Sequence, residues 1–124
     1  MIQEIKNERL KEVYYKINHP TGLTVLLYPM KGFSSAYALF GTRYGSIDTT
    51  FRSNTEEDYI TVPEGVAHFL EHKLFENENG VDAFELFAKT GASANAFTSF
   101  DRTCYEFTCT DHFEESLEIL LNFV

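Results

Sequence analysis

The period of the apolar residues changes along the chain, and this change constrains the fold more than any other feature of the sequence. Five segments are rich in β-forming side chains and are predicted to be strands: residues 12–18, 23–28, 34–44, 93–99 and 103–110. Three segments carry apolar side chains at helical spacing and are predicted to be helices: residues 64–76, residues 81–90 and a third segment that begins at Asp111. The turn residues Pro20 and Gly22 join the first two strands into a hairpin.

The predicted order of elements is β-β-β-α-α-β-β-α. Because strands group with strands and helices with helices, this order indicates an α+β fold, with a largely antiparallel sheet and helices packed on one face. Residues 45–63 are polar and rich in turn formers, so we expect a long loop there, with a short strand near residues 48–51. The side chains predicted to face inward from the three helices are Val66, Phe69, Leu70 and Leu74, then Ala83, Phe84, Phe87 and Ala88, then Phe113, Leu117, Leu120 and Leu121.

The third predicted helix reaches Val124 without the glycine, proline or basic last turn that usually ends a helix. We therefore expect residues 1–124 to be the N-terminal part of a longer domain, cut within its last helix. The alternative is a native C-terminus on a buried helix.

Composition and charge argue against several classes of protein. The 124 residues are 44% hydrophobic and 15% aromatic, which is typical of a globular domain and not of a disordered chain. The formal net charge of −9 would repel a phosphate backbone, so we expect no nucleic-acid partner. No run of about 18 apolar residues is present, and the charged residues 1–16 do not form a secretion signal. We therefore expect no membrane association.

The two cysteines, Cys104 and Cys109, are predicted to lie on one strand. Their odd offset places them on opposite faces of that strand, where a disulfide between them is disfavoured. We expect free thiols, which fit a reducing cytoplasm. A zinc-binding role stays open, although the spacing lacks the close pairing of structural zinc sites.

Two of the four histidines, His68 and His72, lie four residues apart on the first predicted helix, with Glu71 between them. Residues at this spacing share one helix face, with their side-chain roots roughly 6 Å apart. Two imidazoles there can reach one zinc ion at about 2.0–2.1 Å each. Glu71 can point to the same side and accept a proton from a water molecule that zinc polarises. The alternative is an amphipathic helix with exposed histidines.

A catalytic zinc ion usually has three protein ligands and one open position. Glu76 lies two turns beyond His68, about 12 Å along the helix, which is too far for one ion to hold both with His72. Glu64 is excluded for the same reason, and His19 and His112 are distant in sequence. We therefore expect the third ligand to lie outside these 124 residues.

Three stretches carry a resemblance to a known family: GVAHFLEHKLF at residues 65–75, GASANAFTS at residues 91–99, and DRT-x-Y at residues 101–105. The first contains H-x-x-E-H, the inverzincin pattern. In order and spacing the stretches resemble the pitrilysin family, and in particular its bacterial members. Insulin-degrading enzyme and the mitochondrial processing peptidase belong to the same family. The resemblance covers nearly all of the chain.

The resemblance implies that His68 and His72 bind Zn²⁺ and that Glu71 is the catalytic base. It implies that Asn95 and Ala96 lie on an edge strand to which the peptide substrate adds as a further strand. Asn95 could instead be a polar residue satisfied within the sheet. Four apolar or aromatic residues of the matching stretches are expected in the core: Phe69, Leu70, Phe97 and Tyr105.

By resemblance, then, the full-length protein is expected to be a cytoplasmic zinc endopeptidase that hydrolyses extended peptides. Residues 1–124 would form the incomplete N-terminal part of its catalytic domain. A glutamate beyond Val124 would supply the third ligand, and a second homologous half or a partner subunit would close over the substrate. The fragment alone is expected to be inactive. The alternative is a non-catalytic, peptide-binding subunit of a paired peptidase-like complex.

Overall fold

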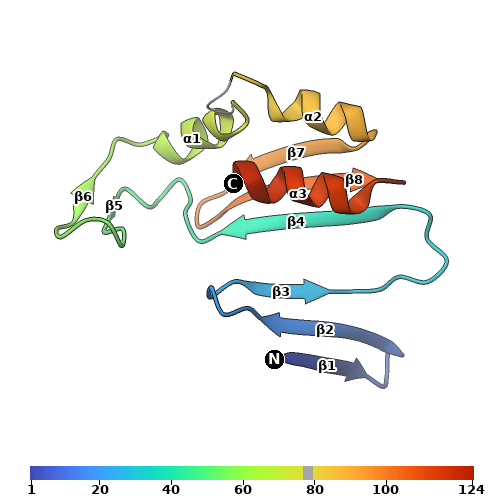
Figure 1. Cartoon of the computed structure of the whole chain (residues 1–124). Coiled ribbons are helices and arrows are strands. Elements are labelled where there is room, and N and C mark those ends of the chain that lie inside the picture. The colour runs from blue at the N-terminus through green and yellow to red at the C-terminus, as the bar shows by residue number, and fades with distance from the viewer. Residues whose placement is uncertain (77–79) are drawn as a thin grey trace. The chain divides into compact units, whose positions relative to one another are not determined.

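The computed structural model describes residues 1–76 and 80–124, and it divides the chain into two compact units, Met1–Phe33 and Ser34–Val124 (Figure 1). Both units have antiparallel sheets, and the second adds the helices. The predicted α+β class is therefore confirmed.

The first unit is a three-stranded antiparallel sheet in the order β1-β2-β3, with β1 at Ile2–Asn7, β2 at Glu12–Asn18 and β3 at Thr24–Leu27. The predicted hairpin is confirmed: its turn is closed by hydrogen bonds from the Gly22 amide to the His19 carbonyl and from the His19 amide to the Leu23 carbonyl. Gly22 has a φ of 91°, which a glycine adopts without strain. Strand β1 was not predicted, because charged residues such as Glu4 and Lys6 interrupt its apolar pattern. The strand is formed by its backbone pairing with β2.

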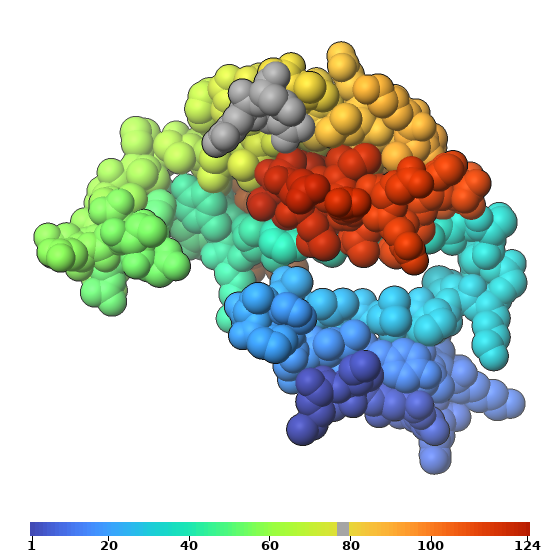
Figure 2. Space-filling model, viewed as in Figure 1, coloured from blue at the N-terminus to red at the C-terminus, as the bar shows by residue number. Residues whose placement is uncertain are grey.

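The second unit is built on a three-stranded antiparallel sheet in the order β4-β8-β7. These strands are β4 (Ala36–Thr42), β8 (Thr103–Cys109) and β7 (Ser93–Thr98). The helices are α1 (Val66–Leu74), α2 (Ala83–Thr90) and α3 (Phe113–Phe123), and they lie in the order that the sequence predicts. In the space-filling view α3 lies directly against α2 (Figure 2).

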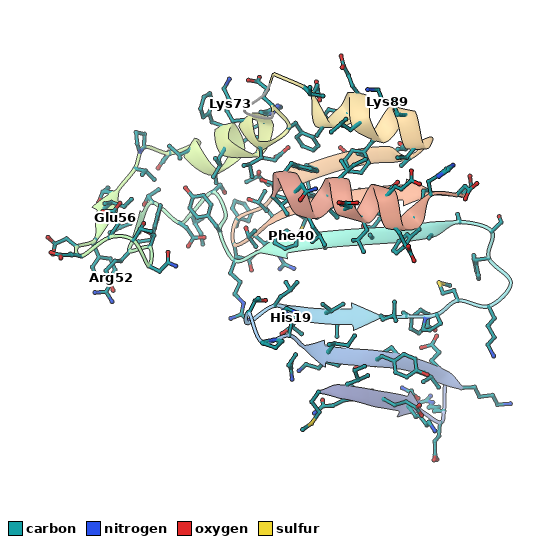
Figure 3. All side chains as sticks on the ribbon, viewed as in Figure 1. His19, Phe40, Arg52, Glu56, Lys73 and Lys89 are labelled. Atoms are coloured by element: carbon teal, nitrogen blue, oxygen red, sulfur yellow. The ribbon has the colours of Figure 1, made fainter. Side chains whose placement is uncertain are left out.

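The core lies between the helices and the central strand β8. Phe107 from β8, Phe87 from α2 and Leu120 from α3 are each 1% exposed. Phe40 on β4, labelled in Figure 3, packs against this cluster from the sheet. Since β8 has a neighbouring strand on both sides, it is the most buried strand and positions the residues that flank it.

The inward faces of the helices differ in part from the prediction. Helix α1 buries Ala67 and Glu71, whereas Phe69 and Leu70 are 64% and 42% exposed. These two core assignments were wrong because the helix packs with its glutamate toward the sheet. Phe97 is 44% exposed, since it alternates with Ala96 on the strand and leaves the helix side.

Other inward-facing residues are as predicted. Tyr105 is 2% exposed, Ala83 and Phe87 are buried in α2, and Leu120 is buried in α3. Four residues that were predicted to face inward are exposed instead: Phe84, Ala88, Phe113 and Leu121. Ser116 is fully buried because its hydroxyl donates a hydrogen bond to Thr90 Oγ1 at 2.9 Å.

The loop at residues 45–63 contains two short paired strands, β5 (Thr50–Phe51) and β6 (Ile60–Thr61). The short strand expected near residues 48–51 is thus present, and its partner was not predicted. The loop is tied to the turn after β7, because the Ser46 amide donates to the Ser99 carbonyl at 2.9 Å. Gly45 is required there, since a Cβ atom would lie 2.3 Å from the Phe100 carbonyl oxygen.

Cys104 and Cys109 are free and buried on β8, as predicted. Cys109 belongs to the core cluster on the helix side, and Cys104 lies on the other face. Burial raises the pKa of both thiols. Throughout residues 1–76 and 80–124, every helix falls short of the length and apolar character that a membrane span needs.

Candidate metal centre

Helix α1 brings the two motif histidines together. It begins after Gly65, whose carbonyl accepts the first helical hydrogen bond from the Phe69 amide at 2.9 Å. Because His68 and His72 are four residues apart on this helix, they lie one turn apart, and their ring centroids are separated by 4.8 Å. The Nε2 atom of His72 lies 3.1 Å from the Nε2 atom of His68, so the two rings converge on one point.

This convergence fits a zinc ion. At zinc–nitrogen distances of about 2.0–2.1 Å, two ligands at tetrahedral corners lie about 3.3–3.4 Å apart. The observed 3.1 Å is close to that separation. The same distance also allows one ring to donate a hydrogen bond to the other, so the pair is satisfied without a metal. The donor set, two exposed imidazoles, is one that zinc prefers.

Glu71 lies on the buried side of α1 and is 7% exposed. Its Oε2 atom accepts a hydrogen bond of 2.7 Å from Thr98 Oγ1. Burial raises the pKa of Tyr105 to about 12, and the Glu71 carboxylate adds to that shift. The carboxylate is therefore held in place beside the histidines by a neighbouring strand.

The three motif residues open into one cleft of about 600 Å³. Helix α1 contributes His68, Glu71 and His72 to its walls, and strand β7 contributes Asn95, Ala96, Phe97 and Thr98. The remaining lining residues are the two aromatic residues Phe75 and Phe84, and Ser46 from the loop. Phe75 and Phe84 stack with centroids 4.3 Å apart, which gives the cleft an apolar wall.

Strand β7 has β8 on one side and is the outer strand of its sheet within the described residues. The Ala96 amide donates to Asn95 Oδ1 at 2.9 Å instead of to β8, so it is directed toward the free edge. Asn95 Oδ1 thus accepts one hydrogen bond within its own strand. The edge donor lies in the same cleft as the histidines.

The other candidate ligands lie elsewhere. Glu76 pairs with Lys73 at 2.8 Å on the exposed side of α1, where Figure 3 labels Lys73. His112 contacts Glu115 at 3.3 Å, and His19 hydrogen-bonds Thr21 within the first unit. In the part of the chain that the structure describes, no group of three or more His, Cys, Asp or Glu residues could hold a metal ion.

Five cleft residues were not predicted as site residues: Ser46, Phe75, Phe84, Phe97 and Thr98. Ser46 and Phe84 reach the cleft only through the tertiary fold. Thr98 lies inside the GASANAFTS stretch that carries the resemblance, and this was the available signal, but its contact with Glu71 spans 27 residues of sequence.

Comparisons with known proteins identify the family. The model of Insulinase (Peptidase family M16) matches residues 53–124, more than half of the chain. A Bacillus subtilis (strain 168) protein, described as uncharacterized zinc protease YmfH, is 51% identical over 124 residues, which is 100% of this chain and 29% of that protein. A nardilysin-like protein of Arabidopsis thaliana is 41% identical over 70 residues, 50% of this chain and 6% of its own length.

A solved structure from Alicyclobacillus acidocaldarius, described as M16-like, superposes with a TM-score of 0.81 at 41% identity and covers 89% of this chain and 25% of that one. The chain thus spans between a quarter and a third of the lengths of these two bacterial relatives. The resemblance seen in the sequence is confirmed, and the chain belongs to the insulinase family, peptidase family M16.

Proposed function

We propose that the protein containing this chain is a zinc-dependent endopeptidase that hydrolyses extended peptides. The observation that carries this proposal is the convergence of two imidazole Nε2 atoms, 3.1 Å apart, in the same cleft as a buried carboxylate. The relative YmfH is named a zinc protease, which supports the same chemistry.

His68 and His72 would hold the zinc ion through Nε2. When bound, zinc would act as a Lewis acid toward a water molecule and a peptide carbonyl. We propose that a third ligand comes from a part of the protein outside this chain. Cys104 and Cys109 are not among the residues lining the cleft, and burial raises their pKa, so we assign them no metal role.

Glu71 is proposed to be the general base. Its Oε2 atom is engaged by Thr98, so Oε1 is the atom that we assign to accept the proton from the attacking water. A carboxylate that is fixed by a hydrogen bond in a partly enclosed cleft needs little reorganisation energy to accept the proton. It can later return that proton to the leaving amine.

Asn95 and Ala96 are proposed to bind the substrate main chain. An extended peptide would add to the free edge of β7, with the Ala96 amide donating to a peptide carbonyl. The Asn95 side chain, which now accepts from that amide, would turn away and become available to the peptide. Main-chain pairing of this kind holds many sequences, and the apolar wall of Phe75 and Phe84 lies next to it.

We propose that the whole protein has further domains beyond this chain and an activity that the chain alone lacks. Residues 1–124 would be the N-terminal part of the catalytic domain, and a second homologous half or a partner subunit would close the cleft. We expect the chain alone to be inactive. A cytoplasmic location is proposed because both cysteines are free.

A second candidate function is peptide binding without cleavage, as a subunit of a paired complex. It is favoured by the observation that the described residues contain only two convergent zinc donors and yet present a strand edge in the same cleft. The presence of Glu71, a base that binding alone would not need, favours the peptidase.

The experiment is a comparison of the full-length protein with its Glu71→Gln variant. We expect the variant to retain zinc, measured by elemental analysis, and to lose about 10²- to 10⁴-fold in turnover of a fluorogenic peptide. Unchanged turnover would remove Glu71 from the base role. Peptide binding without cleavage by the zinc-loaded wild type would favour the second candidate.

A further inference from the structure

Thr98 connects the sheet edge to the candidate base. It is the last residue of β7, and its hydroxyl donates to Glu71 Oε2 at 2.7 Å across 27 residues of sequence. Glu71 is 7% exposed, so water cannot easily replace this donor. A buried carboxylate needs such a partner, and the partner's position sets the orientation of the carboxylate.

The backbone of Thr98 faces a different direction from its side chain. Thr98 pairs with Thr103, next to a closed pair in which the Ser99 amide donates to the Arg102 carbonyl at 2.8 Å. Hydrogen-bonded and open pairs alternate in an antiparallel ladder, so the Thr98 amide and carbonyl point to the free edge, as the Ala96 amide does. One residue thus faces the peptide-binding edge with its backbone and the carboxylate with its side chain.

The end of β7 is held firmly where Thr98 lies. The Ser46 amide donates to the Ser99 carbonyl at 2.9 Å, and the Ile47 amide donates to the Phe100 carbonyl at 3.1 Å. Across the strand pair, Thr103 Oγ1 donates to the Tyr44 carbonyl at 2.8 Å. These bonds fix the strand end, so the Thr98 hydroxyl is a preorganised donor and not a mobile surface group.

We propose that Thr98 is a positioning residue that orients the Glu71 carboxylate toward the cleft. This inference rests on the proposed peptidase function. The hydroxyl, held by the fixed end of β7, binds Oε2 and leaves Oε1 to face the cleft. Without the hydroxyl, the Glu71 carboxylate is still present, but its orientation is no longer fixed.

The test uses the full-length protein with three variants. Thr98→Val removes the hydroxyl at nearly constant shape, and Thr98→Ser restores it. Thr90→Val is the matched control, because Thr90 Oγ1 also makes partly buried hydrogen bonds, to the Phe87 carbonyl and to Ser116, but does not line the cleft. Each variant is assayed for kcat, KM, zinc content and melting temperature.

We expect Thr98→Val to lower kcat about 10- to 100-fold with KM and zinc content nearly unchanged. Thr98→Ser should recover most of kcat, and Thr90→Val should lower the melting temperature without lowering kcat. An undiminished kcat in Thr98→Val, equal impairment in Thr98→Ser, or an equal loss of kcat in Thr90→Val would overturn the proposal.

A readout independent of turnover is the crystal structure of the metal-free Thr98→Val protein. We expect the Glu71 carboxylate to leave the position seen here or to adopt several conformations, and to keep its position in Thr98→Ser. An unmoved, single carboxylate in Thr98→Val would contradict the inference. If the wild type shows no chelator-sensitive turnover, the peptidase proposal itself fails, which is distinguishable from an active wild type with an unaffected Thr98→Val.

Discussion

The Nε2 atoms of His68 and His72 lie 3.1 Å apart on one turn of α1. In the proposed function this pair of rings holds the zinc ion, and without a metal one ring can donate a hydrogen bond to the other. The adjacent residue, Glu71, is 7% exposed, is held by Thr98 of β7 and lines the same cleft as the two rings. One turn of helix thus presents two imidazoles and a carboxylate to a single cleft.

Removal of either histidine should abolish stoichiometric zinc binding by the full-length protein. His68→Ala and His72→Ala each leave one imidazole, so the proposed site would lose one of its ligands. Zinc content by elemental analysis after dialysis measures the effect. Lys73→Ala is the control, because Lys73 is exposed and its salt bridge with Glu76 has little energetic weight. Retention of one zinc per protein in both histidine variants would contradict the assignment.

The burial of two phenylalanines predicts stability effects of very different size. Phe107→Ala should destabilise the folded state by about 3–5 kcal/mol, because Phe107 is 1% exposed in the centre of the core. Phe69→Ala should change stability by about 0.5 kcal/mol or less, since its ring is 64% exposed. Urea unfolding of the full-length protein monitored by circular dichroism measures both values. Similar losses in the two variants would show that Phe69 is covered.

Two glycines of the second unit should differ sharply in their tolerance of alanine. Gly45→Ala would place a Cβ atom 2.3 Å from the Phe100 carbonyl oxygen, so the loop or the hairpin after β7 must move. Gly41→Ala would meet Cys104 Sγ at 3.6 Å, an ordinary contact. We expect the first variant to lose stability and peptide turnover and the second to keep both. Thermal melts and turnover assays check this, and equal tolerance would show that the loop is not anchored there.

Tyr105 should make stability depend on pH in the alkaline range. Burial, and then the Glu71 charge, raises its pKa from 10.0 to about 12 in the folded state. Between these values the unfolded tyrosine loses its proton while the folded one keeps it, so folding stability falls as pH rises from 10 to 12. Tyr105→Phe should reduce this slope, as measured by urea unfolding at several pH values. An identical slope in the variant would exclude Tyr105 as the source.

The buried thiols should be unreactive in the folded protein. Burial raises the pKa of both Cys104 and Cys109, which lowers the fraction of reactive thiolate. Peptide mapping by mass spectrometry after iodoacetamide treatment should show both cysteines unmodified in native protein and both modified after unfolding. Rapid native labelling of either thiol would indicate that β8 opens locally.

The elements that the sequence predicted well are those with strong local signals. Helix α1 and the placement of His68 and His72 on one face follow from their spacing alone. The face that α1 buries did not follow, because Phe69 and Leu70 satisfy an apolar pattern while Glu71 is the residue that packs inward. A buried glutamate needs a hydrogen-bond partner, here Thr98, and a contact between residues 27 positions apart cannot be read from a local sequence pattern.

Strand pairing limited the prediction in a similar way. The outer strand β1 was missed because its charges show no apolar run, whereas its ladder with β2 defines it in three dimensions. The edge position of β7 also depends on the sheet order and not on its own sequence. The edge strand at Asn95 and Ala96 was therefore expected through family resemblance and not from local pattern, and β7 is the outer strand of its sheet among the described residues.

The most direct test of the zinc site is anomalous X-ray diffraction at the zinc absorption edge from crystals of the full-length protein. The account predicts one anomalous peak about 2.0–2.1 Å from the Nε2 atoms of both His68 and His72, with Glu71 close by but not coordinated. A zinc-loaded protein whose peak lies at other residues, with these two rings turned apart, would contradict it.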